Sequence, residues 1–270
     1  MHASQDVPGR VPVRHPYFDD PTGVVALAHR GFALDGRENS LTAFANAVDL
    51  GFRYVETDAH ATVDGVACAL HDDTLDRTTD GEGVVSELPW SVVCRARIGG
   101  VDPVPQLVDV LGTWPDLRVN IDVKSAGAVG PVAEAIERTA SHDRVCVTSF
   151  SAARRRATVA RLSRPVATSA ATGEVARFVA AHRAHAARLA GRALRDVDAL
   201  QVPVAQGRVR VVDAGTVAAA HAAGRSVHVW TVNEPAEMHR LLDLGVDGLV
   251  TDRADLLRDV LRARGTWPTP

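Results

Sequence analysis

The sequence predicts an α/β protein folded as a (β/α)8 TIM barrel. Short apolar, β-rich runs recur along the chain, and helix-like stretches rich in Ala and Leu separate most of them. Strands that are apolar on both faces and alternate with helices are typical of a parallel sheet covered by helices. The 270 residues would fit two small domains or one barrel. Because the alternation continues over most of the chain, we favour a single barrel domain over residues 1–270, with its core at about 24–264.

The candidate strands and helices follow one another in a regular order. The strand candidates are Val24–Ala28, Tyr54–Thr57, Val66–Leu70, Val119–Val123, Val145–Thr148, Val166–Thr168, Ala199–Val202, Val227–Trp230 and Gly248–Thr251. The clearest helix candidates are Thr42–Leu50, Val129–Ala140, Thr216–Ala223 and Pro235–Leu244.

This list contains one strand more than an eight-stranded barrel can take. The gap between Thr57 and Val66 is too short for the helix that normally joins two parallel strands. It contains Asp64-Gly65, which is typical of a tight turn. Two arrangements therefore stay open: a barrel that lacks one helix, or an extra hairpin.

Two regions interrupt the alternation. Residues 72–105 combine Gly, Pro, Thr and acidic residues, and we expect a small insertion over the C-terminal face of the barrel at about 76–104. Ser151–Arg195 is rich in Ala and Arg and has a helical pattern. We interpret much of it as solvated surface, and we expect the run Arg154–Arg156 to lie on an exposed helix face.

Charge and composition exclude several classes of protein. A net charge of −3 and a pI of about 6.4 give no basic face for nucleic acid. Three cysteines without a C-x-x-C pair indicate a reducing compartment. Met1–Asp20 has no apolar stretch of the kind found in signal peptides, and no run approaches the ~20 apolar residues that span a bilayer. We expect a cytoplasmic protein without a membrane span, of undetermined oligomeric state.

Polar residues follow several of the apolar runs. The loops at the carboxyl ends of barrel strands build the active site in this architecture. These positions hold His29–Gly31, Glu56–Asp58, His71-Asp72, Asn120–Lys124 and Trp230–Asn233. The sequence therefore predicts that these segments meet at one mouth of the barrel.

The carboxylates in this set predict a cation. Glu56 and Asp58 are two residues apart, so both point to one side of their strand. They would repel each other unless a cation or protons neutralised them. Asp122 and Lys124, the only lysine of the chain, have the same spacing. Carboxylates without a nearby Cys or obvious His ligand suit Mg²⁺ or Ca²⁺, and imidazoles and cations around them suit a phosphate.

A set of short motifs gives the chain its resemblance to a known family. They are Ala28–Gly31, Glu38–Phe44, Val55–Asp58, Thr62–Gly65, His71–Thr79, Val104–Leu107, Asn120–Lys124, Trp230–Asn233 and Gly245–Asp252. In identity and order these motifs resemble those of the glycerophosphodiester phosphodiesterases, in the phospholipase-C-like TIM-barrel superfamily. The match runs from about residue 24 to 260.

The resemblance implies roles for individual residues. His29 and His71 would be the catalytic pair, acting as general acid and base. Arg30 and Lys124 would bind the phosphate. Trp230 would line the glycerol side of the pocket.

The resemblance also implies a metal site. Glu56, Asp58 and Asp122 would hold one divalent cation, Mg²⁺ or Ca²⁺. Asp122 stands where the family usually has a longer Glu. The insertion at about 76–104 corresponds to a small subdomain that the family places over the site, and it is where we expect head-group selectivity.

The activity implied is metal-dependent hydrolysis of a small-molecule glycerophosphodiester to sn-glycerol 3-phosphate and an alcohol. A first alternative is a lysophospholipase D-type phosphodiesterase, which would need an apolar groove for an acyl chain. With 4% aromatic residues and no apolar lid in 72–105, the sequence does not indicate one. A second alternative is a catalytically inactive phosphate-ester-binding barrel. Every position of the motif set holds a competent residue type, which disfavours that alternative.

Overall fold

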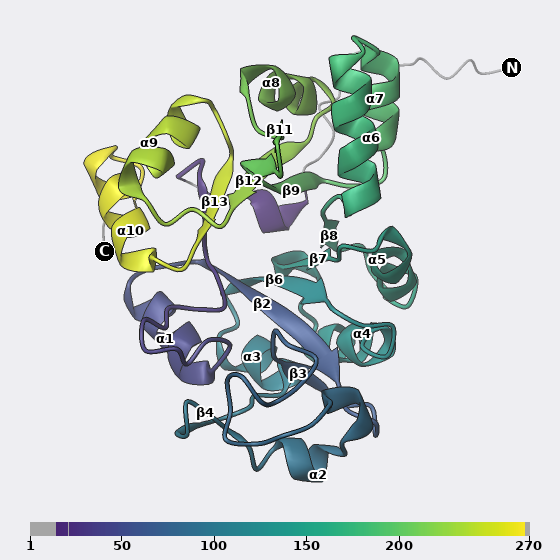
Figure 1. Ribbon diagram of the computed structural model, residues 1–270, viewed down its shortest axis with the longest axis vertical. Helices are drawn as coiled ribbons and strands as arrows, with labels where there is room; N and C mark the ends of the chain where they lie inside the picture. Colours follow the sequence, from purple (N-terminus) through teal and green to yellow (C-terminus); the bar gives the residue numbers. More distant parts are fainter. Residues whose placement is uncertain (1–14, 21, 268–270) are drawn as a thin grey trace, which may run out of the picture.

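The computed structural model describes residues 15–20 and 22–267. Within these residues, eight parallel strands form a nearly closed barrel in the order β8-β7-β6-β2-β1-β13-β12-β9 (Figure 1). The strands are β1 Val25–Ala28, β2 Tyr54–Ala61, β6 Arg118–Val123, β7 Val145–Thr148, β8 Ala167–Thr168, β9 Ala199–Pro203, β12 Ser226–Trp230 and β13 Gly248–Thr251. A parallel bridge between Ser169 and Ala199 links the two ends of the sheet. The predicted fold class is confirmed.

Helices surround the barrel and connect its strands (Figure 1). They are α1 Leu41–Asp49, α3 Leu107–Thr113, α4 Val129–Arg138, α5 Ala152–Val159, α6 Thr172–Arg183, α7 Ala187–Ala193, α8 Ala214–Ala222, α9 Pro235–Asp243 and α10 Ala254–Ala263. Most of them bury apolar residues at helical spacing, as α10 does with Leu257, Val260 and Leu261, whereas α5 buries Arg155 and Thr158. This packing fixes the strands in position and so fixes the residues at their ends.

The N-terminal end of the barrel is closed by the 3₁₀ helix η1, Pro16–Phe18. Its residues Tyr17 and Phe18 are buried inside the ring of strands, where Figure 1 shows this segment in purple. The hydroxyl of Tyr54 donates to the Tyr17 carbonyl over 2.8 Å. A cavity of any size must therefore lie at the other end, where the strands finish.

The extra strand candidate forms a hairpin. Strand β2 continues beyond its neighbours to Ala61, turns at Asp64-Gly65 and pairs antiparallel with β3, Ala67–Ala69. Gly65 has φ +82°, which a glycine adopts without strain. The sequence left a hairpin and a missing helix open, and the hairpin is correct.

The segment after β3 has a small apolar core of its own. It contains η2 Val85–Glu87, α2 Trp90–Val93, β4 Arg97–Ile98 and β5 Asp102–Pro103. Its buried residues include Leu75, Val85, Val93 and Ile98. Figure 1 shows it beside β3, on the side of the barrel away from α6 and α7.

The arginine run on α5 was predicted wrongly in part. Arg155 is only 1% exposed, and its two guanidinium Nη atoms donate to the carboxylate of Glu174 on α6 over 2.9 Å each. Arg156, next to it, is exposed. Successive residues of a helix point about 100° apart, so a run of three cannot share one face.

One glycine allows the loop after β1 to lie against α1. Gly31 has φ +84°, and a Cβ there would lie 2.6 Å from the carbonyl carbon of Ala43. Helix α1 begins just before that residue, with the Ser40 hydroxyl accepting from the Ala43 amide over 3.0 Å. The close approach holds His29 and Arg30 over the end of the barrel.

Within the described residues, no helix is both long enough and apolar enough to cross a membrane.

Candidate active site

A cavity of about 690 Å³ opens at the carboxyl ends of the strands. Its wall includes all the residues that the sequence singled out, namely His29, Arg30, Glu56, Asp58, His71, Asp122, Lys124 and Trp230. They come from the ends of β1, β2, β6 and β12 and from the loop after β3. The structure therefore brings the whole predicted set to one place.

Strand register places the acidic residues side by side. Asp58 on β2 is paired in register with Asp122 on β6, and Lys124 follows two residues later. The Lys124 ammonium lies 2.7 Å from Asp58 Oδ1 and 2.7 Å from Asp122 Oδ2. Burial opposes protonation of Lys124, but the two carboxylates outweigh it and raise its pKa.

Asp58 is the best compensated of the three carboxylates. Burial would raise its pKa, but the charges of Lys124 and Arg30 outweigh burial and hold that pKa below its usual range. Arg30 Nε lies 3.1 Å from Asp58 Oδ2, and the Asn39 amide donates to the same oxygen over 3.1 Å. Asp58 is therefore ionised in the site.

Glu56 and Asp122 are compensated less well. Burial, and next the charge of Asp58, raise the pKa of Glu56 to about 8. Its Oε2 accepts from the Arg30 amide over 3.2 Å and lies 3.7 Å from His29 Nε2. Burial also raises the pKa of Asp122, and in the described part of the chain its Oδ1 has no hydrogen-bond partner.

These carboxylates are the ligand type that a hard divalent cation prefers. The free oxygen of Asp122 and the high pKa of Glu56 both indicate that positive charge would stabilise the cluster. As the side chains stand, Lys124 supplies that charge to Asp58 and Asp122. Among residues 15–20 and 22–267, no three His, Cys, Asp or Glu side chains converge closely enough to hold a metal ion. The residues fit a cation by chemistry, and the ammonium competes for the same oxygens.

His29 is oriented by a carboxylate that the sequence did not identify. Its Nδ1 lies 2.6 Å from Asp252 Oδ1, just after β13, and the Asn233 amide donates to Asp252 Oδ2 over 2.9 Å. Burial opposes protonation of His29, but the Asp252 hydrogen bond and the charge of Glu56 outweigh it, so its pKa is raised. The Nε2 atom is left on the Glu56 side, in the cavity.

His71 has the same kind of support. Its Nδ1 lies 2.6 Å from Asp72 Oδ1, and Arg77 donates to both oxygens of Asp72, over 2.5 and 3.0 Å. The hydrogen bond from Arg77 is the main reason why the pKa of Asp72 lies well below its usual range. Both histidines thus have one nitrogen bound to an ionised carboxylate and the other free for chemistry.

A chain of ion pairs connects the Asp72 carboxylate beside His71 to Arg30. Arg77 donates from Nη2 to Glu38 Oε1 over 2.7 Å, and Arg30 donates from Nη1 to the same oxygen over 2.8 Å. The guanidinium predicted to bind phosphate is therefore held by Glu38. Motif position alone gave neither Glu38 nor Arg77 a role, because their partners are distant in sequence.

Asp72 is among the strand-end residues named from the sequence, although without a role, and Asp252 could have been found in the same way. Each directly follows a strand-end segment, by the same rule that selected His29 and His71. Phe150 had no such signal. Its side chain is 58% exposed at the cavity wall. The centre of its ring lies 6.0 Å from the ring centre of Trp230 and 5.8 Å from the Lys124 Nζ.

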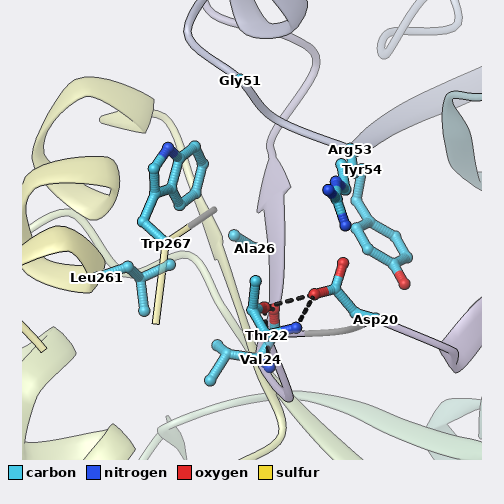
Figure 2. Close-up of a pocket in the computed structure, with 9 residues that line it drawn as sticks. All are labelled: Asp20, Thr22, Val24, Ala26, Gly51, Arg53, Tyr54, Leu261 and Trp267. Carbon is cyan, nitrogen blue, oxygen red and sulfur yellow. Dashed lines mark hydrogen bonds between the residues drawn. The ribbon is translucent and has the colours of Figure 1, made fainter. Parts of the chain in front are cut away.

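Figure 2 shows a second, much smaller pocket. It lies near the amino ends of the strands, because Val24 and Tyr54 line it where β1 and β2 begin. It is lined by residues that include Thr22, Arg53 and Trp267, and Thr22 bonds to Asp20 there. Its volume of about 10 Å³ is about that of one water probe, so it can hold no substrate. The chemistry therefore belongs to the large cavity.

The site combines histidines oriented by carboxylates, cationic side chains and buried carboxylates at the carboxyl end of a TIM barrel. This combination defines a class of barrel enzymes that act on phosphate esters. Comparison with known proteins gives the family within that class. Residues 29–256 match the model of the glycerophosphoryl diester phosphodiesterase family. The chain belongs to this family of hydrolases, and the predicted family and enzyme class are confirmed.

Relatives match over nearly their full length. A protein from Mycobacterium tuberculosis named "probable glycerophosphodiester phosphodiesterase 2" is 48% identical over 246 residues, which cover 91% of this chain and 93% of that protein. A glycerophosphodiester phosphodiesterase from Caldanaerobacter subterraneus is 27% identical, covering 89% of this chain and 99% of its own.

Solved structures share the fold. A glycerophosphodiester phosphodiesterase from Agrobacterium tumefaciens superposes with a TM-score of 0.72 at 24% identity, over 88% of this chain and 99% of its own. A phosphodiesterase from Oleispira antarctica, solved in complex with the product sn-glycerol-3-phosphate, has a TM-score of 0.72 at 20% identity, over 88% and 96% of the two chains.

Proposed function

We propose that this enzyme hydrolyses small-molecule glycerophosphodiesters to sn-glycerol 3-phosphate and an alcohol, with His29 and His71 as general acid and base. The observation that carries the proposal is the pair of imidazoles in one cavity, each with Nδ1 2.6 Å from a carboxylate. One neutral ring would take the nucleophile's proton, and the other, protonated, would donate to the leaving oxygen. Each role contributes ~10²–10⁴ in rate.

The phosphate would lie between Arg30 and Lys124. Arg30 offers a planar fork of donors, and Lys124 is a compact ammonium. Both line the cavity, and both form ion pairs with carboxylates there. Trp230 would lie beside the glycerol.

We also propose that Glu56, Asp58 and Asp122 hold one divalent cation, Mg²⁺ or Ca²⁺. When bound, the cation would polarise a phosphoryl oxygen. The support is the buried, incompletely compensated charge of Glu56 and the free oxygen of Asp122. With Asp58 and Asp122 bound to that cation, the Lys124 ammonium would be available to a phosphate oxygen.

The direct test is a panel of glycerophosphodiesters that differ in their alcohol, with release of sn-glycerol 3-phosphate as the measurement. We expect turnover of several members of the panel in the presence of Mg²⁺ or Ca²⁺. An inactive, phosphate-ester-binding barrel would instead bind these esters and release nothing. The cytoplasmic location stays a prediction from the sequence.

A further inference from the structure

The large cavity extends well beyond the charged residues. Past Phe150 and Trp230 it continues along α6 and the small hairpin of β10, Ala205–Gln206, and β11, Val209–Arg210. We call this part the apolar arm. Its wall contains Val175, Ala176, Val179, Ala180, Val209 and Val211.

Helix α6 forms one side of the apolar arm. Residues 175, 176, 179, 180 and 183 recur every three or four positions, so they lie on one face of the helix. The helix begins beside Phe150, where the Thr172 amide donates to the Phe150 carbonyl over 3.3 Å. Its 12 residues make it about 18 Å long. The arm therefore leads away from the charged centre along the helix.

The β10–β11 hairpin forms another part of the wall. Arg183, at the end of α6, donates to the Arg210 carbonyl over 2.6 Å and so connects the helix to the hairpin. Figure 1 shows β11 close to α6 and α7, on the side opposite the 76–104 segment. Among the described residues that line the cavity, none comes from 76–104.

The chemistry of the arm differs from that of the charged centre. Of its described lining residues, Arg183 is the one charged side chain, and it lies at the far end of α6. Val209 is 43% exposed, and Ala176 and Ala180 are also exposed. Exposed apolar side chains grouped in a cavity mark a binding site for an apolar group.

We propose that the apolar arm binds a hydrocarbon chain carried by the phosphodiester, so that single-chain diesters such as lysophospholipids are substrates. The inference rests on the proposed function, because the phosphate must lie at Arg30 and Lys124 for the chain to reach α6. In the net reaction the oxygen of water bonds to phosphorus and the bond from phosphorus to the leaving oxygen breaks. One proton of that water ends on the leaving oxygen, which departs as the alcohol. Phe150 and Trp230 lie where the polar and apolar parts meet.

The first measurement is kcat/KM for glycerophosphocholine and for lysophosphatidylcholines of increasing chain length, below their micelle concentrations, with Mg²⁺ or Ca²⁺. Each methylene buried in the arm should raise kcat/KM by up to about fourfold, until the arm is full. A flat or falling lysophosphatidylcholine series would exclude a chain on the glycerol, and the same result with the alkyl esters described below would overturn the inference.

Two variants locate the effect. Ala180→Phe should block the arm and Val209→Asp should make it polar. For each variant we compare kcat/KM for a long-chain substrate with kcat/KM for glycerophosphocholine. The ratio of the first to the second should fall by about tenfold, which corresponds to the loss of about two buried methylenes. Matched controls are Ala222→Phe on α8 and Val101→Asp on the 76–104 segment, both exposed and outside the cavity wall. Equal ratios in variants and controls would contradict the assignment.

The position of the chain on the diester needs a second substrate series. In lysophosphatidylcholine the chain is on the glycerol, whereas in alkyl esters of glycerol 3-phosphate it is on the leaving alcohol. If kcat/KM rises with chain length in one series alone, that series shows whether the chain on the glycerol or the chain on the leaving alcohol enters the arm. A gain in neither series contradicts the proposal.

A binding measurement separates failure of the arm from failure of the proposed function. Calorimetric titration with n-alkyl phosphates and with inorganic phosphate needs no turnover. We expect affinity to rise with alkyl length in the parent protein and to rise less in Val209→Asp. If glycerophosphocholine is turned over but the affinity for alkyl phosphates does not rise with chain length, the apolar arm does not bind a hydrocarbon chain and the proposed function stands. The rise without turnover of any diester overturns the proposed function and leaves the arm as a binding site.

Discussion

His29 and His71 line one cavity, and each is held by the same kind of hydrogen bond. In each, Nδ1 binds a carboxylate, Asp252 or Asp72, which fixes the ring orientation and leaves Nε2 available for the proposed proton transfer. A carboxylate in this position also stabilises the imidazolium that forms when the ring accepts a proton. The two aspartates are therefore positioning residues for the proposed acid and base.

Asp252→Asn tests the role of the hydrogen bond between Asp252 and His29. The amide keeps the shape of the side chain but removes the charge that supports a protonated His29, so we expect kcat to fall about 10²-fold or more with a small change in KM. Steady-state kinetics would measure this, with thermal unfolding to show that the fold is kept. Asp259→Asn, exposed on α10, is the matched control. An unchanged kcat in Asp252→Asn would remove Asp252 from the mechanism.

Lys124 is the only lysine of the chain, and its place in the site gives it a specific task. Its Nζ fits between Asp58 and Asp122 at 2.7 Å from each. A guanidinium needs more room and binds as a flat fork. We expect Lys124→Arg to lower kcat/KM by at least about tenfold, the loss of roughly one charged hydrogen bond. If kcat/KM of this variant equalled that of the parent enzyme, the site would not require a lysine at position 124.

At the scale of single elements, the strands determine the site more than the helices do. The register of β2 with β6 brings Asp58 beside Asp122, although the two are far apart in sequence. The alternation of side chains along a strand was visible in the sequence, so Glu56 and Asp58 could be predicted to share a side. The β2–β6 pairing itself follows from the barrel topology.

The helices α5 and α6 were the least predictable elements. Their Ala- and Arg-rich sequence indicated solvated surface, yet one face of α6 lines the cavity and α5 is connected to it by a buried ion pair. Composition cannot show which arginine of Arg154–Arg156 faces a partner, because that depends on where Glu174 lies. The apolar arm was missed for the same reason, since it forms only when α6 meets the β10–β11 hairpin.

The ion pair between α5 and α6 leads to a stability prediction. Arg155→Ala would leave Glu174 buried without its main partner, and we expect the free energy of unfolding to fall by about 3–5 kcal/mol. Arg156→Ala on the exposed side of α5 should cost no more than about 1 kcal/mol. Urea denaturation of both variants would show the difference. Equal losses would mean that the buried pair does not stabilise this side of the barrel.

At the scale of the whole molecule, the fold could be predicted because its signal is repeated. Alternating apolar strands and helices occur around the entire barrel, so one ambiguous run, which became β3, did not change the architecture. The candidate site could be predicted because barrel chemistry gathers at strand ends. The contacts that the sequence could not predict are single tertiary ones, such as Arg77 with Glu38 and Arg155 with Glu174.

We expect phosphodiester hydrolysis at this cavity to depend on a cation held by Glu56, Asp58 and Asp122. The measurement that tests it most directly is sn-glycerol 3-phosphate release from glycerophosphocholine by the full chain, after chelation and again after addition of Mg²⁺ or Ca²⁺. We predict that chelation abolishes turnover and that the cation restores it in the parent enzyme. In Glu56→Gln, folded as shown by its thermal transition, we predict that the cation does not restore it. Full turnover by the chelated, metal-free enzyme would contradict the account.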